Sequence, residues 1–427
     1  MREYIDVLPN NVNQSQNVSF RDGNPLVQFR IGAQERYLLG STIRLCGTIK
    51  VLDSDTSATP AAGKNCAIDP RLGVYSVLDQ LVISSAKTSQ TIEHIRNYNR
   101  FLSTYIPVTS SPNDLIGHMG ISSLSAANVD ASQNQITEVG SGTDTSFSIT
   151  LPCGFFLGQN PIPLSNTWGV KGVDISIFLA PDNAVLFSSD QTTVPSTCFY
   201  QLSNLHLTAE VENPAPDQLS QLMRQANHSY EYNSISGFYA TIKNSYATIN
   251  FQLGQSRVLS FFASFIQSSR LNNFGHNSFA TPDLKNGDTH INIKEVFFTR
   301  DAIKFPQEYI MTSLQHATST NRGEDPQITK NFLNAVSPFS KLRRTTISPY
   351  NTPADDTIGY NLPDGGNIFG IGCALDIISN QGVDYSNSQF GMVVNSDLSG
   401  DSPQSVFLFV HAKQTLLMNQ SGVQVLN

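Results

Sequence analysis

Histidines are the side chains of this chain that could hold a catalytic metal, because neutral imidazole is the commonest metal ligand in proteins. A metal site in a cupin-type β barrel needs two histidines at H-x-H spacing on one strand, with a later histidine and a glutamate. No such pair and no H-E-x-x-H motif is present. His206 and His290 fall on the polar side of alternating strands, which favours solvent-facing imidazoles. We therefore expect no metal. The eight histidines are His94, His118, His206, His228, His276, His290, His316 and His411.

The sequence also lacks the usual motifs for nucleotide binding and for a nucleophilic serine. The sequence has no G-x-x-x-x-G-K-[ST] loop and no G-x-S-x-G elbow. The run from Gly370 to Leu375 begins like a dinucleotide fingerprint, but it lacks the third glycine and better fits a buried strand. Asp355 and Asp356 lie in a Pro/Gly loop, where solvation keeps both ordinary acids. We expect no catalytic residue, no cofactor-binding residue and no cofactor.

The sequence gives no support for a glycosidase, although it does not exclude one. A glycosidase can take its two carboxylates from distant parts of a sequence. Its cleft usually also needs aromatic platforms, and this chain has one tryptophan, Trp168.

Composition indicates a packed protein with a polar but weakly charged surface. The chain has 427 residues, which is too long for one ordinary core and suggests two domains, or three at most. It is 39% apolar and only 14% charged. A net charge of −8 and a pI near 5.4 disfavour a surface that coats nucleic acid. The one compact basic cluster, Lys341 to Arg344, fits a solvated loop or a subunit contact better. We expect no direct contact with nucleic acid.

The cysteines indicate folding in a reducing compartment. Five cysteines are an odd number, and none forms a C-x-x-C pair. The start MREYIDVLPNNVN has no apolar core of a secretion signal, and no apolar run is long enough to span a membrane. We expect five reduced thiols, with Cys153 and Cys373 the slowest to react if they lie in equivalent barrel interiors. The others are Cys46, Cys66 and Cys198.

Period-two alternation predicts many half-buried strands in antiparallel sheets. Apolar residues alternate with polar ones along Ile43 to Val51, Phe147 to Leu151, Val173 to Leu179 and Ala247 to Leu253. Long polar inserts separate the strands, and they favour either loops gathered at the sheet ends or surface elaboration. These inserts are Asp53 to Asn65, Ser122 to Thr145 and Ser379 to Pro403.

Two short helices are predicted, one in each half. Ser89 can cap a helix whose apolar residues follow at roughly helical spacing, with Glu93 in its first turn and Pro107 beyond its end. Those apolar residues are Ile92, Ile95, Tyr98 and Leu102. The second candidate covers Ile328 to Val336.

The two halves are similar in style, and a break lies between them. The strand from Leu205 ends in Glu-Asn-Pro-Ala-Pro (Glu212 to Pro216), where two prolines remove amide donors. A faint repeat aligns Leu151 to Asn166 with Gly370 to Asn387, which pairs Cys153 with Cys373 and either marks equivalent strands or is coincidence. Duplicated β-rich halves without a catalytic signature predict a structural protein rather than an enzyme.

Three segments resemble the double jelly-roll major capsid proteins of icosahedral double-stranded DNA viruses, and among these the virophage and polinton-like virus type. SVFLFVHAKQTLLMNQSGVQVLN (Ser405 to Asn427) is similar to their C-terminal strands, with a turn through Gln414. FYQLSNLHLTAEVENPAPDQL (Phe199 to Leu219) resembles the last strand of the first jelly roll and the linker after it. DPRLGVYSVLDQLVISS (Asp69 to Ser85) is similar to early strands of the first barrel.

The resemblance implies an all-β chain with two consecutive eight-stranded antiparallel jelly-roll barrels and short helices in the loops. We divide the chain into an N-terminal arm (1–17), a first jelly roll (18–213), a linker (214–222) and a second jelly roll (223–427). Candidate subunit contacts are the segment Met1 to Asn17 and the helix from Ser89.

The function implied is that of a major capsid protein. Its homotrimers form pseudo-hexagonal capsomers that tile an icosahedral shell. The implied partners are the chain itself, in trimers and between trimers, and penton and minor capsid proteins, while the sequence leaves contact with an inner membrane undecided. The implied location is the virion, after synthesis and folding in the host cytoplasm. Two alternatives stay open: a minor (penton or vertex) capsid protein, and a non-viral β-sandwich protein for carbohydrate binding or adhesion.

Overall fold

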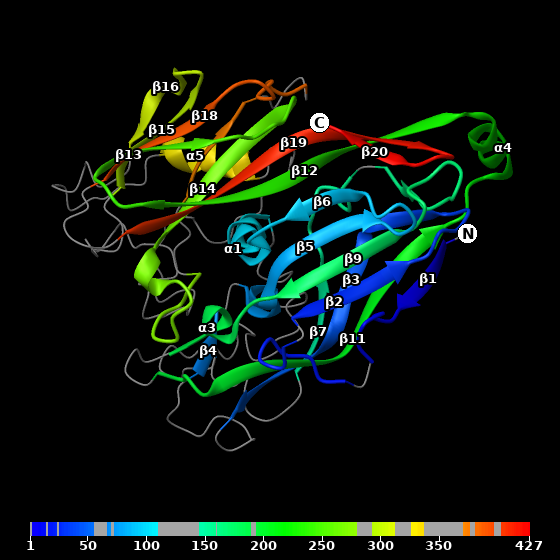
Figure 1. The fold of residues 1–427 in the computed structure, drawn as a ribbon, viewed down its shortest axis with the longest axis horizontal. Coiled ribbons are helices and arrows are strands. Elements are labelled where there is room, and N and C mark those ends of the chain that lie inside the picture. The colour runs from blue at the N-terminus through cyan, green and yellow to red at the C-terminus, as the bar shows by residue number, and fades with distance from the viewer. Residues whose placement is uncertain are drawn as a thin grey trace.

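The protein is built from two β-sandwich units that follow one another along the chain (Figure 1). Lys341 to Arg344, Asp355 and Asp356, and most of the inserts Asp53 to Asn65 and Ser122 to Thr145 lie outside the residues that the structure describes. The third predicted insert, Ser379 to Pro403, is wrong as a loop, because it contains strand β18 (Phe390–Ser396), which pairs with two other strands. The computed structural model describes residues 2–13, 16–23, 25–54, 66–69, 72–109, 145–158, 160–188, 194–279, 293–311, 326–336, 370–375, 381–396 and 403–427.

The first unit has two four-stranded layers, in the orders β1-β11-β3-β7 and β2-β9-β5-β6, with antiparallel pairing throughout. Short β8 pairs with β3, and β4 pairs with β10 in a separate two-stranded sheet. The strands are β1 (Arg2–Val7), β2 (Leu26–Ile31), β3 (Tyr37–Asp53), β4 (Cys66–Ile68), β5 (Leu78–Ser85), β6 (Thr91–Ile95), β7 (Thr145–Thr150), β8 (Ile162–Pro163), β9 (Val173–Leu179), β10 (Leu186–Ser188) and β11 (Cys198–Glu212).

The second unit has layers in the orders β12-β19-β14-β17 and β13-β18-β15-β16, also antiparallel, with β20 pairing with β19. Its strands are β12 (Asn227–Ile242), β13 (Tyr246–Phe251), β14 (Val258–Gln267), β15 (Ile293–Arg300), β16 (Ile303–Met311), β17 (Gly370–Ala374), β18 (Phe390–Ser396), β19 (Gln404–Asn419) and β20 (Val423–Leu426).

The two units share one topology. When β4, β8, β10 and β20 are set aside, each unit has eight main strands among the described residues. Numbered along the chain, the first strand neighbours the eighth, then the third and the sixth, while the other layer runs second, seventh, fourth, fifth. Eight strands in two such antiparallel layers form a jelly roll. The prediction of two consecutive jelly-roll barrels is therefore confirmed, and we name the units the first and second barrels.

The predicted alternation matches burial in the first barrel. Ile43, Leu45, Ile49 and Val51 of β3 are all at most 3% exposed, while the polar-face residues that alternate with them, Arg44, Cys46, Thr48 and Lys50, are only half-buried. Each alternating strand thus lays one face on the core.

Two strands of the second barrel depart from alternation because both of their faces are covered. On β14, Phe261, Ala263 and Phe265 belong to the core inside the second barrel. Phe262 and Ile266 of the same strand point the other way and join the hydrophobic core of the first barrel. β19 behaves alike, and its run from Ser405 to Ala412 is buried throughout. Continuous apolar runs are typical of strands covered on both faces.

The helices differ from the prediction in the first half and agree with it in the second. Ser89 has a left-handed φ of 53° in the turn between β5 and β6, and Ile92 and Ile95 lie on β6. The helix begins later, at α1 (Tyr98–Thr109), and contains Pro107 instead of ending before it. α5 (Pro326–Val336) confirms the second candidate. The other helices among the described residues are α3 (Asp182–Val185), α4 (Pro216–Arg224) and the 3-10 helices η1 (Gly73–Val77) and η5 (Ser268–Arg270).

The ends of the first barrel are well defined. Residues 2–7, expected within an arm, form β1 and pair with β11 at the edge of the sheet. Only Ile5 and Val7 mark this strand as apolar, which is too short a pattern to predict it. β11 ends at Glu212, within the predicted break, and the exposed helix α4 then leads into β12.

The predicted repeat and the predicted C-terminal segment each differ from the structure in one detail. β7 and β17 hold equivalent places in their sheets, but Cys153 lies three residues after β7 while Cys373 lies on β17. The two cysteines are therefore not at equivalent positions. Gln414 is not in a turn: it lies inside the long strand β19, and the turn comes at Gly422 before β20.

Candidate functional site: the junction between the barrels

The two barrels meet where the β12-β19-β14-β17 sheet of the second barrel lies over β6 and α1 of the first (Figure 1). One hydrophobic cluster runs through this contact and holds residues of both barrels. From the second barrel it takes Tyr230, Tyr232, Ile235, Phe262 and Phe409, all at most 4% exposed. The junction is thus a buried surface that fixes one barrel on the other.

A buried carboxylate lies at the centre of this junction. Glu93 of β6 is 3% exposed. Its Oε1 accepts hydrogen bonds from the backbone N–H of Gly154 at 3.1 Å and of Ile235 at 2.7 Å, and its Oε2 accepts one from Phe155 N–H at 2.8 Å. The Cys153 thiol donates to it as well. Because Ile235 belongs to β12, this one side chain ties β6 and the loop after β7 to the second barrel.

The electrostatics of Glu93 follow from its burial. Loss of hydration raises the pKa of Glu93 to about 7, while the three backbone N–H donors and the Cys153 thiol oppose that rise. Burial, and then the Glu93 charge, raise the pKa of Cys153 well above its ordinary value. All four of these partners donate to the carboxylate, so Glu93 serves as an internal brace between parts of the protein.

Glycines allow the two backbones to approach closely at this point. A Cβ on Gly154 would lie 1.7 Å from the carbonyl oxygen of Asn233 on β12. A Cβ on Gly237 of β12 would lie 2.4 Å from the carbonyl oxygen of Arg96, just after β6. The hydroxyl of Tyr232 lies 2.7 Å from the carbonyl oxygen of Ile92, a further polar contact across the junction. Bare backbone at these positions is what lets Glu93 reach β12.

Helix α1 supplies the apolar half of the junction. The Phe101 ring lies 5.6 Å from the Phe409 ring and 6.3 Å from the Phe262 ring, measured between centroids. It also lies 6.3 Å from the imidazole of His411. Burial lowers the pKa of His411 to about 4, so this imidazole is neutral at physiological pH. α1, buried in this way, is not available as the subunit contact expected of the predicted helix.

Arg100 of α1 is buried between aromatic rings of the second barrel. Its guanidinium carbon lies 4.3 Å from the centroid of Phe279 and 5.3 Å from that of Phe407. Burial lowers the pKa of Arg100 to about 10, and the nearby carboxylates of Asp79 and Asp69 act against this. The charge is kept in a buried place by ring faces, which attract cations.

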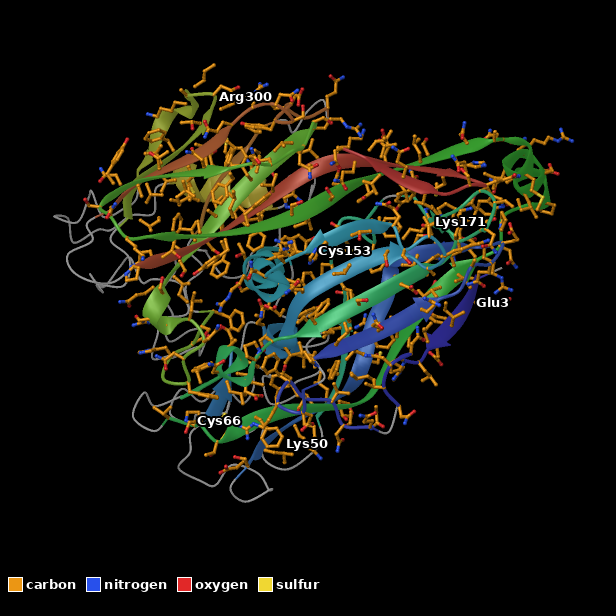
Figure 2. The ribbon with its side chains drawn as sticks, viewed as in Figure 1. Glu3, Lys50, Cys66, Cys153, Lys171 and Arg300 are labelled. Carbon is orange, nitrogen blue, oxygen red and sulfur yellow. The ribbon has the colours of Figure 1, made fainter. Side chains whose placement is uncertain are left out.

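Polar contacts extend the junction away from Glu93. Asn277 donates to Oδ2 of buried Asp69 at 2.9 Å, and Asn183 donates to the carbonyl oxygen of Asn272 at 2.7 Å. Lys171, labelled in Figure 2, donates to the carbonyl oxygen of Gln420 at 3.2 Å. Each pair joins a residue of the first barrel to one of the second.

The residues considered for chemistry are scattered. Within the described ranges, no group of three or more His, Cys, Asp or Glu side chains is placed to hold a metal ion. His206 is half-buried on the polar face of β11, with its Nδ1 3.0 Å from the carbonyl oxygen of Asn204, and His290 lies outside the described residues. Trp168 is 1% exposed and its ring lies against that of Tyr37 at a tilt of 56°, so it offers no sugar platform. No helix in the described part of the chain is long and apolar enough to cross a membrane.

Sequence reasoning missed the junction, and Glu93 above all. The glutamate was assigned to the first turn of a helix, and its Ile235 partner is 142 residues away. The one available signal was the run SVFLFVHA, whose lack of alternation marks a strand covered on both faces.

Gly154→Ala should destabilise the protein by about 3 kcal/mol, because a methyl group there cannot avoid the Asn233 carbonyl unless the barrels shift. Urea unfolding measures the loss. Gly32→Ala is the matched control, since a Cβ at Gly32 meets nothing within 4 Å. Equal stability of the two variants would contradict the close approach of the barrels.

Glu93 should make stability depend on pH. Its folded pKa of about 7 lies above the ordinary value of 4.5, so its contribution is fully present below pH 4.5 and is lost as pH rises through 7. Wild type should therefore lose up to about 3 kcal/mol relative to Glu93→Gln between pH 4.5 and pH 8. Urea unfolding of both proteins measures this difference, in which the common His411 contribution cancels.

The control for this prediction is Asp6→Asn on the exposed face of β1. Its stability should run parallel to that of wild type over the same range. A Glu93→Gln protein that also runs parallel to wild type would show that Glu93 titrates as it does in the unfolded chain.

Comparison with known proteins supports the fold. No family model and no curated protein sequence matches the chain. Among solved structures, the Faustovirus major capsid protein is similar with a TM-score of 0.60 at 8% identity, over 98% of this chain and 90% of that one. The PBCV-1 virus capsid is similar with a TM-score of 0.58 at 11% identity, over 100% of this chain and 96% of that one. The Sputnik virophage structure is similar with a TM-score of 0.53 at 12% identity, over 100% of this chain and 88% of that one. The chain therefore has the double jelly-roll fold of viral major capsid proteins.

Proposed function

We propose that this protein is a major capsid protein, a structural subunit of an icosahedral virion shell. The observation that carries the proposal is the pair of jelly rolls with one strand order, matched over the whole chain by viral major capsid proteins. A likeness restricted to one barrel would equally fit many unrelated proteins. A likeness that includes both barrels and the linker between them favours this one role.

The junction supports the proposal because a shell subunit must be rigid. A jelly roll alone presents one body, whereas two docked barrels present two similar bodies at a fixed spacing. The buried Glu93 hydrogen bonds, the rings around Phe101 and the continuous apolar cluster hold that spacing. Three such subunits around an axis carry six similar barrels, which give a pseudo-hexagonal outline able to tile a surface by near-equivalent contacts.

The surface is compatible with association between copies. Only 14% of residues are charged, so close packing of like subunits meets few like-charge penalties. Several large apolar side chains stay exposed on the edges of the barrels. These are Tyr4 on β1, Tyr239 on β12, Tyr246 on β13 and Ile303 on β16, each more than half exposed.

The assignment of domains and partners belongs to the same proposal. We place the boundary in the linker 214–222, within the stretch between β11 and β12. The partners are copies of this chain in homotrimers and between trimers, together with penton and minor capsid proteins. The location is the virion, after synthesis in the host cytoplasm. A minor vertex protein is the second candidate, but two equal barrels favour the major protein.

Light scattering of the purified protein tests the assembly. We expect a particle of about 140 kDa, three times the chain mass of 46.7 kDa, that persists on dilution because obligate interfaces bury on the order of 2,000 Å² or more. Gly32→Ala is the control that should leave this mass unchanged. A protein that stays monomeric at micromolar concentration at every salt and pH would contradict the capsid function.

A further inference from the structure

The two barrels have equivalent sheets, and the junction uses the outer face of one of them. In the second barrel, the β12-β19-β14-β17 sheet turns its outer face to the first barrel. The sheet with the same strand order in the first barrel is β1-β11-β3-β7. Its edge strand β1 lies on the side of the first barrel away from the second barrel (Figure 1). The outer face of this sheet therefore has the same place in its barrel as the junction face, but a different environment.

Tyrosines on the first strand of each barrel show this difference. On β12, Tyr230 and Tyr232 point out of the second barrel and are 4% and 3% exposed, because the first barrel covers them. On β1, Ile5 and Val7 pack inward against the hydrophobic cluster. Tyr4 alternates with them, so it points outward, and it is 80% exposed. Outward tyrosines are thus buried on the first strand of one barrel and left in solvent on that of the other.

The rest of the outer face of β1-β11-β3-β7 is polar, and its groups already bind one another. Arg44 of β3 donates from Nε to the hydroxyl of Ser148 on β7 at 2.8 Å, and also to the carbonyl oxygen of Ser148 at 2.8 Å. The hydroxyl of Thr48 lies 2.6 Å from that of Ser203. Such a face is wetted in a single chain, and it can be covered without leaving these polar groups unpaired.

We infer that the outer face of β1-β11-β3-β7 binds a second copy of this chain, through the edge of that copy's second barrel at β16. β16 is the fifth main strand of its barrel and lies at the edge of its layer, as β6 does in the first barrel. Within the chain, β6 is the strand that meets β12. The same contact made between chains joins the first barrel of one copy to the second barrel of the next. Ile303, at the start of β16, is 64% exposed and offers apolar area for this contact.

The face is large enough for a stable contact. β11 and β3 have 15 and 17 residues, and β1 and β7 have six each. At ~3.3 Å per residue and ~4.8 Å between strands, the four strands cover about 700 Å². Burial of that area on both partners removes about 1,400 Å² from water, which lies in the range of specific interfaces, roughly 1,200 to 2,000 Å².

The contact is directional, because each copy uses the first barrel on one side and the second barrel on the other. Contacts of this head-to-tail kind give closed rings when the rotation between neighbours closes. Three copies then form a ring of six barrels, in which contacts within a chain alternate with contacts between chains. The inference rests on the proposed function and names the surface through which the copies associate.

Tyrosine footprinting of the native wild-type protein tests the face directly. In a single chain Tyr4 is 80% exposed and Tyr246, on β13 of the other layer of the second barrel, is 61% exposed. In the three-copy particle, hydroxyl radicals should modify Tyr4 about fivefold more slowly than Tyr246, because a packed interface excludes water. Mass spectrometry of the digested protein measures both rates. Equal modification of the two tyrosines in that particle would overturn the inference.

Thr208→Arg and Ser84→Arg are a matched pair of variants. Both residues are half-buried on the outer face of a strand, and each lies opposite an aspartate, Asp6 for Thr208 and Asp174 for Ser84. Thr208 lies on the proposed face, whereas Ser84 lies on the other layer of the same barrel. By light scattering at micromolar concentration, Thr208→Arg should have the mass of one chain, 46.7 kDa, and Ser84→Arg the threefold larger mass of wild type.

The outcomes separate this face from the capsid function. A three-copy particle from Thr208→Arg, with Tyr4 freely modified in wild type, would overturn the face and leave the capsid function standing. A wild-type protein that stays a single chain would overturn both. Circular dichroism shows whether Thr208→Arg folds, and if it does not, the modification of Tyr4 in wild type still decides.

Discussion

The structure depends on one sheet that is buried on both faces. β14 and β19 give one face to the core of the second barrel and the other to the helix and loops of the first. A sheet covered on one side only would leave Phe262, Phe407 and Phe409 in water, where apolar area costs about 25 cal/mol per Å². Without the first barrel, the outer apolar faces of β14 and β19 would be exposed to water. The same faces hold the two barrels together.

Glu93 sets the register of that contact. Apolar faces are non-directional and would allow the barrels to slide, whereas a carboxylate bound to three backbone N–H groups on both sides is satisfied in one arrangement. A buried charge with unmade hydrogen bonds is costly, so neighbouring arrangements are penalised. The glycines at 154 and 237 belong to the same arrangement, because each removes the side chain that would keep the backbones apart.

The sequence allowed the fold class to be predicted because strand patterns are local. Alternation in Ile43 to Val51 shows the buried face directly, and the break at Glu212 to Pro216 shows the end of a barrel. The junction could not be predicted, since Glu93 and Ile235 are 142 residues apart and a lone glutamate beside apolar residues fits a helix or an exposed strand equally well. The helix from Ser89 was wrong for a related reason: Ile92 and Ile95 match helical spacing by coincidence, while a left-handed turn at Ser89 and pairing with β5 make the segment a strand.

The central claim is that two docked barrels per chain build a shell from threefold units. Electron microscopy of the purified protein in negative stain tests it most directly. The account predicts particles with a hexagonal outline and six lobes, two from each chain. Isolated two-lobed particles, or particles with separated lobes at variable spacing, would contradict it.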